Sequence, residues 1–69
     1  MINLNNFLFK KVIIIDDEDN VWHGRVSVYE SAYDNDSEED SIIAEIVEKN
    51  EMSIEFTQSE IKSIEIDNE

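Results

Sequence analysis

The stretch that most constrains the fold runs from residue 21 to residue 29 (VWHGRVSVY), because it has the character of a long β-strand with a glycine inside it. It also contains the only Trp, His, Gly and Arg of the chain. A period of two places Trp22, Gly24, Val26 and Val28 on one face, and Val21, His23, Arg25, Ser27 and Tyr29 on the other. An interior glycine is typical of a bulge or sharp bend, so we expect a small sheet that curls over onto itself.

Runs rich in β-branched residues recur along the chain at hairpin spacing. They predict strands at residues 10–16, 21–30, 42–48, 52–57 and 61–66. Polar turns are expected at 17–20 and 49–51, and one tight helical turn at 58–60. Met52, Ile54, Phe56, Ile64 and Ile66 should point inward. Helix formers at 42–52 leave a helical alternative there, which the β-branched residues disfavour.

The remaining segments complete a single domain over residues 1–69. Residues 2–9 predict a short N-terminal helix or turn, residues 31–41 an acidic loop, and residues 67–69 a loose tail. A chain of 69 residues has a thin core, and the absence of cysteine removes disulfides and thiolate metal sites. We therefore expect self-association to add stability, and a cytoplasmic location with no membrane segment.

The formal net charge of −13 comes from 18 acidic and five basic residues. It argues against nonspecific binding to nucleic acid or to anionic membranes, both of which require Lys and Arg. Two interpretations stay open. The acids form a solubilising surface, or they mimic nucleic acid and dock on a basic partner.

Catalytic and metal chemistry find little support in the sequence. His23 is the only classical acid–base side chain, and no nucleophile motif accompanies it, so we do not expect an enzyme. The acid run resembles a calcium loop in part, with Asp34, Asp36, Glu38, Asp40 and Glu45 at ligand positions. However, Glu39 stands where such a loop requires glycine, so we expect no metal site and no cofactor.

Candidate contact residues are polar or aromatic side chains that the pattern places away from the core. Trp22 is expected in the core, because large aromatic residues dominate burial in small domains. The predicted binding surface consists of His23, Arg25, Tyr29, Tyr33, Asp34, Asp36, Glu38, Glu39 and Asp40.

The order of a short helix followed by five strands resembles the Sm-like (LSm) domain family, in particular its small bacterial and phage-type branch. Two segments carry the resemblance: residues 22–26 (WHGRV) match the family's apolar-x-Gly-x-apolar pattern, and residues 56–64 (FTQSEIKSI) match its last strands. The resemblance implies an all-β, five-stranded, strongly bent barrel. It also implies that the exposed fourth and fifth strands pair between neighbouring copies.

The sequence departs from the pattern of RNA-binding family members. Their Asp-x-x-Asn loop corresponds to an acidic run here, and Thr57 and Gln58 replace their Arg-Gly pair. We therefore expect a non-enzymatic, homo-oligomeric binding module that contacts a protein partner or a small ligand. The alternative is an acidic inhibitor or nucleic-acid mimic from a mobile element, and an RNA-binding ring is the third hypothesis.

Overall fold

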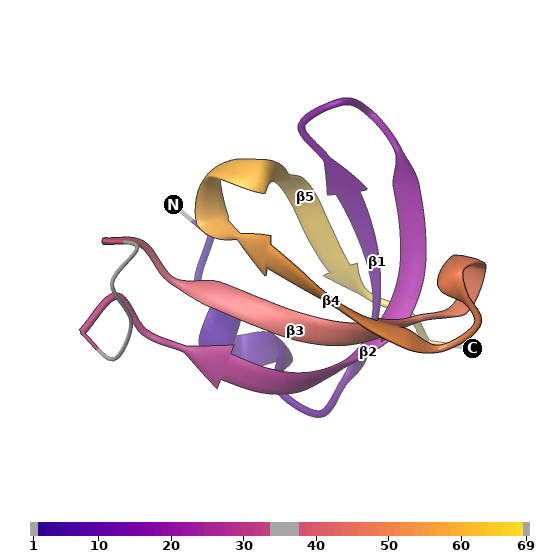
Figure 1. Ribbon diagram of the computed structural model, residues 1–69, viewed down its shortest axis with the longest axis horizontal. Coiled ribbons are helices and arrows are strands. Elements are labelled where there is room, and N and C mark those ends of the chain that lie inside the picture. Colours follow the sequence, from indigo (N-terminus) through magenta and orange to yellow (C-terminus); the bar gives the residue numbers. More distant parts are fainter. Residues whose placement is uncertain (1, 34–37, 69) are drawn as a thin grey trace.

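The computed structural model describes residues 2–33 and 38–68, which form one bent antiparallel sheet with three short 3-10 turns. The elements are η1 (Leu4–Phe7), β1 (Lys11–Asp16), β2 (Val21–Glu30), β3 (Ser41–Ile46), η2 (Val47–Lys49), β4 (Met52–Thr57), η3 (Gln58–Glu60) and β5 (Ile61–Ile66). The strand order is β4-β3-β2-β1-β5, so β4 and β5 are the edges and the sheet is not closed (Figure 1). The all-β class is thereby confirmed.

Element boundaries agree closely with the sequence prediction for β2, β4, β5 and η3. The third strand ends earlier than expected, because residues 47–49 form the 3-10 turn η2 and Asn50 takes a left-handed conformation with φ of 56°. A short helix or turn was predicted at residues 2–9, and the structure has the four-residue 3-10 turn η1 there. Its two asparagines favour local hydrogen bonds over a regular helix.

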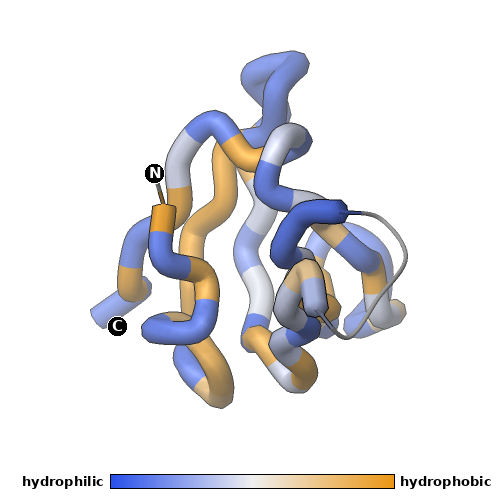
Figure 2. The backbone as a smooth tube through the Cα atoms, turned by 90° about the vertical axis from the view of Figure 1, so that its left-hand side faces the viewer, coloured by the Kyte–Doolittle hydropathy of each residue, from blue (hydrophilic) through white to orange (hydrophobic). Residues whose placement is uncertain are grey.

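The core consists of apolar side chains from η1 and all five strands, on the inner face of the bent sheet. Its buried members are Leu4, Val12, Ile14, Val26, Ile42, Ala44, Ile46, Phe56 and Ile61. The hydrophilic connection between β1 and β2 projects away from this core (Figure 2). No helix within residues 2–33 and 38–68 is long and apolar enough to cross a membrane.

A register shift in β2 corrects part of the predicted face assignment. Pairing of β2 with β3 is regular up to Val26 and shifts before Val28, so Ser27 is an extra residue of the kind found in a β-bulge. The shift reverses the alternation beyond it. Val28, predicted inward, is 40% exposed, and Tyr29, predicted outward, packs against the core.

Gly24 is not the extra residue of a β-bulge, since the register shift lies beyond it at Ser27. A Cβ atom at Gly24 would lie 2.5 Å from the carbonyl oxygen of Glu45 and 2.8 Å from Cδ1 of Ile46. Only glycine therefore lets β3 approach β2 this closely at the bend.

Two apolar residues at the ends of the edge strands are more exposed than predicted. Met52 begins β4 and is 63% exposed, and Ile66 ends β5 and is 38% exposed. Both were expected to point inward. They lie on strands that pair on one side only, so within the described residues no further strand covers these ends.

Candidate functional site

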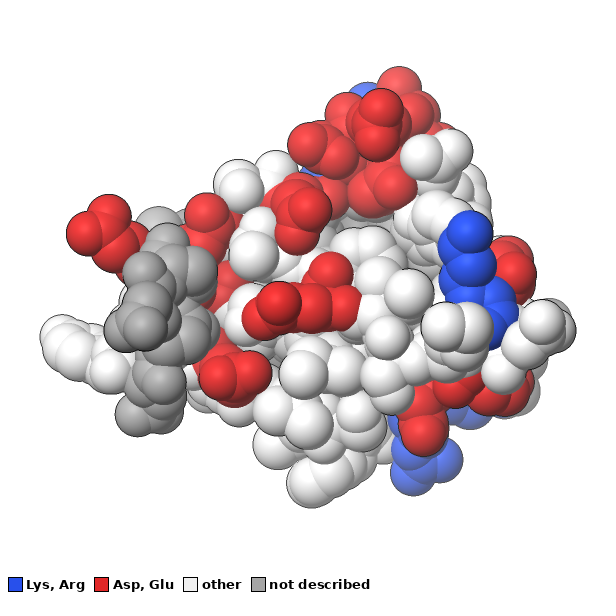
Figure 3. All heavy atoms as spheres, viewed as in Figure 1, with Lys and Arg blue, Asp and Glu red and all other residues white. Residues whose placement is uncertain are grey.

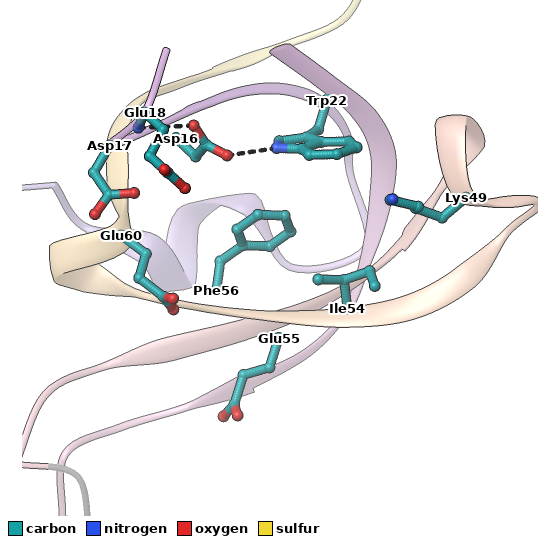
Figure 4. Close-up of a pocket in the computed structure, with 9 residues that line it drawn as sticks. All are labelled: Asp16, Asp17, Glu18, Trp22, Lys49, Ile54, Glu55, Phe56 and Glu60. Atoms are coloured by element: carbon teal, nitrogen blue, oxygen red, sulfur yellow. Dashed lines mark hydrogen bonds between the residues drawn. The ribbon is translucent and has the colours of Figure 1, made fainter. Parts of the chain in front are cut away.

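A hollow of about 210 Å³ lies between the β1–β2 hairpin and β4 (Figure 4). Its lining combines five carboxylates, one ammonium group and three apolar side chains. These residues are Asp16, Asp17, Glu18, Trp22, Lys49, Ile54, Glu55, Phe56 and Glu60. We call this site the acidic hollow. A concave surface with an apolar floor and a few polar groups is the usual form of a binding site.

The floor of the acidic hollow is aromatic and aliphatic. Period-two alternation along β4 turns Ile54 and Phe56 into the hollow, while Glu55 lies on the other side of the strand (Figure 4). Trp22, at the start of β2, contributes its indole ring from the opposite wall. All three side chains pack within or against the core, so the floor is part of the folded framework.

Asp16 fixes the hairpin that forms one wall. Its carboxylate accepts a hydrogen bond from Trp22 Nε1 at 2.9 Å, and further bonds from the backbone N–H groups of Glu18 and Asn20 at 2.9 and 2.8 Å. The bond from Trp22, and then those from Asn20 and Glu18, lower the pKa of Asp16, although partial desolvation opposes them. Asp16 therefore stays ionised and holds the indole ring in place.

The other rim carboxylates differ in how they are engaged. Glu60 Oε1 accepts hydrogen bonds from the backbone N–H and Oγ1 of Thr57, which caps η3. Within the described residues, no hydrogen bond or ion pair engages the carboxylates of Asp17, Glu18 or Glu55. Acidic side chains gather over the hairpin on this face of the molecule (Figure 3). Several carboxylates around one concavity focus a negative field there, which favours a cation.

Lys49 already supplies a cation to this site. Its Nζ lies 5.4 Å from the centroid of the Trp22 ring, within the range of a cation–π interaction. It reaches the hollow from η2, the turn between β3 and β4. The geometry thus accommodates an alkylammonium group against the indole ring.

The state of Asp16 leads to a prediction about acid unfolding. The pKa of Asp16 in the folded state is below its ordinary value of 3.8. Ionised Asp16 therefore stabilises the fold fully above pH 3.8, and this stabilisation is lost as the pH falls through the folded-state pKa. We expect Asp16→Asn to be less stable than the wild type near pH 7 and to approach it as the pH falls below 3.8. Urea unfolding near pH 7 and below pH 3.8 measures this difference, and a difference independent of pH would contradict the assignment.

A second hollow, of about 360 Å³, lies on the outer face and contains two of the predicted contact residues, His23 and Arg25. His23 Nδ1 lies 2.5 Å from Glu48 Oε2, and the His23 backbone N–H donates to Glu48 Oε1 at 2.8 Å. Partial burial opposes the effect, but these hydrogen bonds and the charge of His23 lower the pKa of Glu48. His23 therefore ties β2 to η2.

The predicted contact residues at the far end of β2 lie apart from His23 and Arg25. Tyr29 donates from its hydroxyl to Asp40 Oδ2 at 2.9 Å, and Asp40 Oδ1 accepts from the Ala32 backbone N–H. Glu39 accepts from the backbone N–H and hydroxyl of Ser59. Of the other predicted contact residues, Tyr33 and Glu38 are exposed, and Asp34 and Asp36 lie outside the described residues. The predicted surface is thus divided between two places.

The acidic hollow was not predicted, because its residues come from five separate stretches of the chain: 16–18, 22, 49, 54–56 and 60. The available signal was the acidic residues 16–18 shortly before Trp22. The sequence pattern assigned Asp16 to the end of a strand, residues 17 and 18 to a turn, and Trp22 to the core. Within residues 2–33 and 38–68, no group of three or more acidic or histidine side chains is placed to hold a metal ion.

Comparison with protein-family models, with characterised proteins and with solved structures finds no significant match for this chain. The features of this chain that bear on its function are therefore the acidic hollow and the two edges of the sheet.

Proposed function

We propose that this chain is a cytoplasmic, non-enzymatic binding module of the Sm-like type, which assembles with further copies of itself. The observation that carries the proposal is the open sheet, in which no strand of the described part of the chain pairs with the outer edge of β4 or of β5. Unpaired edges expose backbone N–H and C=O groups that favour pairing with another chain. Exposed apolar side chains at the ends of both edges, Met52 and Ile66, add a reason for contact.

The two edges also match in sequence. β4 and β5 are each six residues long. If β4 pairs antiparallel with β5 of a second copy and Met52 lies opposite Ile66, then Ile54 lies opposite Ile64. Ser53 faces Glu65 and Glu55 faces Ser63 in this register, so no two acids oppose each other within the two strands, although Glu51 and Asp67, just outside them, do.

Registers shifted by two residues also place acids opposite each other. Glu65 then faces Glu55 in one direction and Glu51, just before β4, in the other. Like charges directly opposite each other destabilise a strand pair. Within the strands, charge thus disfavours the register that pairs Glu65 with Glu55 in copies that each carry a net charge of −13.

Ser63 offers a test of this pairing. It is exposed on β5 and lies opposite Ile15 within its own sheet, so a charge there has no charged cross-strand partner within the protomer. We expect Ser63→Glu to weaken self-association about threefold, by repulsion from Glu55 of the second copy, and Ser63→Lys to strengthen it about threefold. Sedimentation velocity and native mass spectrometry measure both. Equal effects of the two substitutions, or none, would argue against pairing in this register.

The acidic hollow favours a second candidate function, in which this protein docks on a basic partner protein. The carboxylates of Asp16, Asp17, Glu18 and Glu60 border the apolar floor, and Lys49 is the one cation among the lining residues. Association through such a site should weaken as salt rises, because counterions screen exposed charges. A titration with an arginine-bearing peptide, repeated over a range of NaCl concentrations, tests this function. Affinity that does not respond to salt would contradict it.

A further inference from the structure

We infer that the acidic hollow binds an arginine side chain presented by an extended segment of a basic partner protein. The inference deepens the second candidate function and rests on it. It specifies the group that is recognised and the strand beside which the partner segment lies.

The lining of the hollow fits both parts of an arginine side chain. An arginine stem is apolar, and it can cover the floor formed by Trp22, Ile54 and Phe56 while the charged head remains at the polar rim. The planar guanidinium stacks well on aromatic rings and can meet carboxylates with two parallel hydrogen bonds. Asp17 and Glu18 are suitable acceptors, because neither carboxylate is engaged within the described residues.

The position of Lys49 indicates that the acidic hollow can accommodate a cation against the Trp22 ring. Its ammonium group lies against the Trp22 ring, and it comes from the same chain. A lysine there partly neutralises the rim and covers one side of the indole. An incoming arginine must displace it, so Lys49 acts as an internal competitor that lowers the affinity of the site.

The free edge of β4 explains why the partner segment should be extended. Ile54 and Phe56 of β4 line the hollow, and β4 pairs with β3 on one side only. A peptide added along β4 would form backbone hydrogen bonds and turn alternate side chains to one face. One of these side chains would then reach the hollow.

Fluorescence of Trp22 gives a direct measurement, because it is the only tryptophan of the chain. The probe is the capped peptide acetyl-SVTRTVS-amide, and the control peptide carries citrulline in place of arginine. Citrulline has nearly the same shape but no charge. We expect the arginine peptide to bind about tenfold more tightly and to change the Trp22 emission.

Matched variants separate the hollow from the overall charge. Two double variants, Asp17→Asn/Glu18→Gln and Glu30→Gln/Glu45→Gln, each reduce the net charge from −13 to −11, since each neutralises two acids. Only the first pair borders the hollow. We expect the first double variant to weaken binding about fivefold and the second less than about twofold. Lys49→Met should strengthen binding about threefold by removing the competitor.

Two results would overturn the inference: equal affinity for the arginine and citrulline peptides, or equal weakening by the two double variants. If the two double variants weaken binding equally but binding remains sensitive to salt, the protein binds basic partners by its net charge and the hollow has no part in it. If neither peptide binds at any salt concentration, the second candidate function itself fails. Self-association of the same variants in the absence of peptide, followed by sedimentation velocity, tests the pairing of β4 with β5 separately.

Discussion

Gly24→Ala is expected to reduce the free energy of unfolding by about 3 kcal/mol, because the added methyl group meets β3 where no space exists. Its Cβ would lie 2.5 Å from the carbonyl oxygen of Glu45, a backbone atom that can move only if the strand moves. A domain of 69 residues has a total stability of roughly 3–10 kcal/mol, so the substitution should remove at least about a third of it. Urea denaturation followed by Trp22 fluorescence measures the loss.

Ser53→Thr is the matched control for Gly24→Ala, since it also adds one methyl group to a strand. Ser53 lies on the edge strand β4 and is exposed, so the change should stay within about 0.5 kcal/mol. A Gly24→Ala protein as stable as the wild type would show that β3 does not depend on close approach at this point.

Leu4→Ala should destabilise the fold by about 3 kcal/mol, because Leu4 is fully buried although it lies in a turn of only four residues. No side chain caps η1, so this short turn depends on the core for its stability. We expect the variant to lose η1 as well as global stability. Hydrogen exchange of the backbone N–H of Asn6, which bonds to the carbonyl oxygen of Asn3, measures the local effect.

Phe9→Ala provides the comparison within the same segment. Phe9 is 64% exposed, so its truncation removes little buried surface and should change stability by less than about 0.5 kcal/mol. Equal effects of Leu4→Ala and Phe9→Ala would mean that the segment before β1 contributes only general hydrophobicity, with no specific packing.

The strands were predictable because their sequence patterns are local. Each pattern can be interpreted without reference to the rest of the chain. Alternation predicts the strand at 52–57, β-branched residues predict the strand at 61–66, and the polar cluster predicts the turn at 17–20. The tight turn at 58–60 was predicted for the same reason, and its Thr57–Glu60 capping box is a local interaction too.

The wrong predictions concern side chains whose exposure depends on tertiary contacts. Ser27 carries no signal that it would be the extra residue of a register shift, yet this shift alone exchanges the faces of Val28 and Tyr29. Met52 and Ile66 continue an inward pattern in the sequence, but the open edges leave them exposed. The exposure of such residues depends on which strand lies next to them, and alternation does not encode that.

The candidate site was harder to predict, since it forms only when the sheet bends. The bend brings the acid run 16–18 opposite Phe56 and Glu60, about forty residues further along the chain. The predicted contact residues, by contrast, were chosen because the strand pattern and the acidic loop place them away from the core. His23 and Tyr29 lie six residues apart on one strand, and the structure assigns them to different surroundings.

The position of β4, at once an edge of the sheet and a wall of the acidic hollow, links the two proposed modes of association. A strand from a second copy and a segment from a basic partner would need the same border, so a protomer can accept one of them at a time. The two equilibria are then coupled by mass action: rising partner concentration withdraws protomers from the assembly, and dilution of the partner returns them. Assembly size would therefore report how much partner is present.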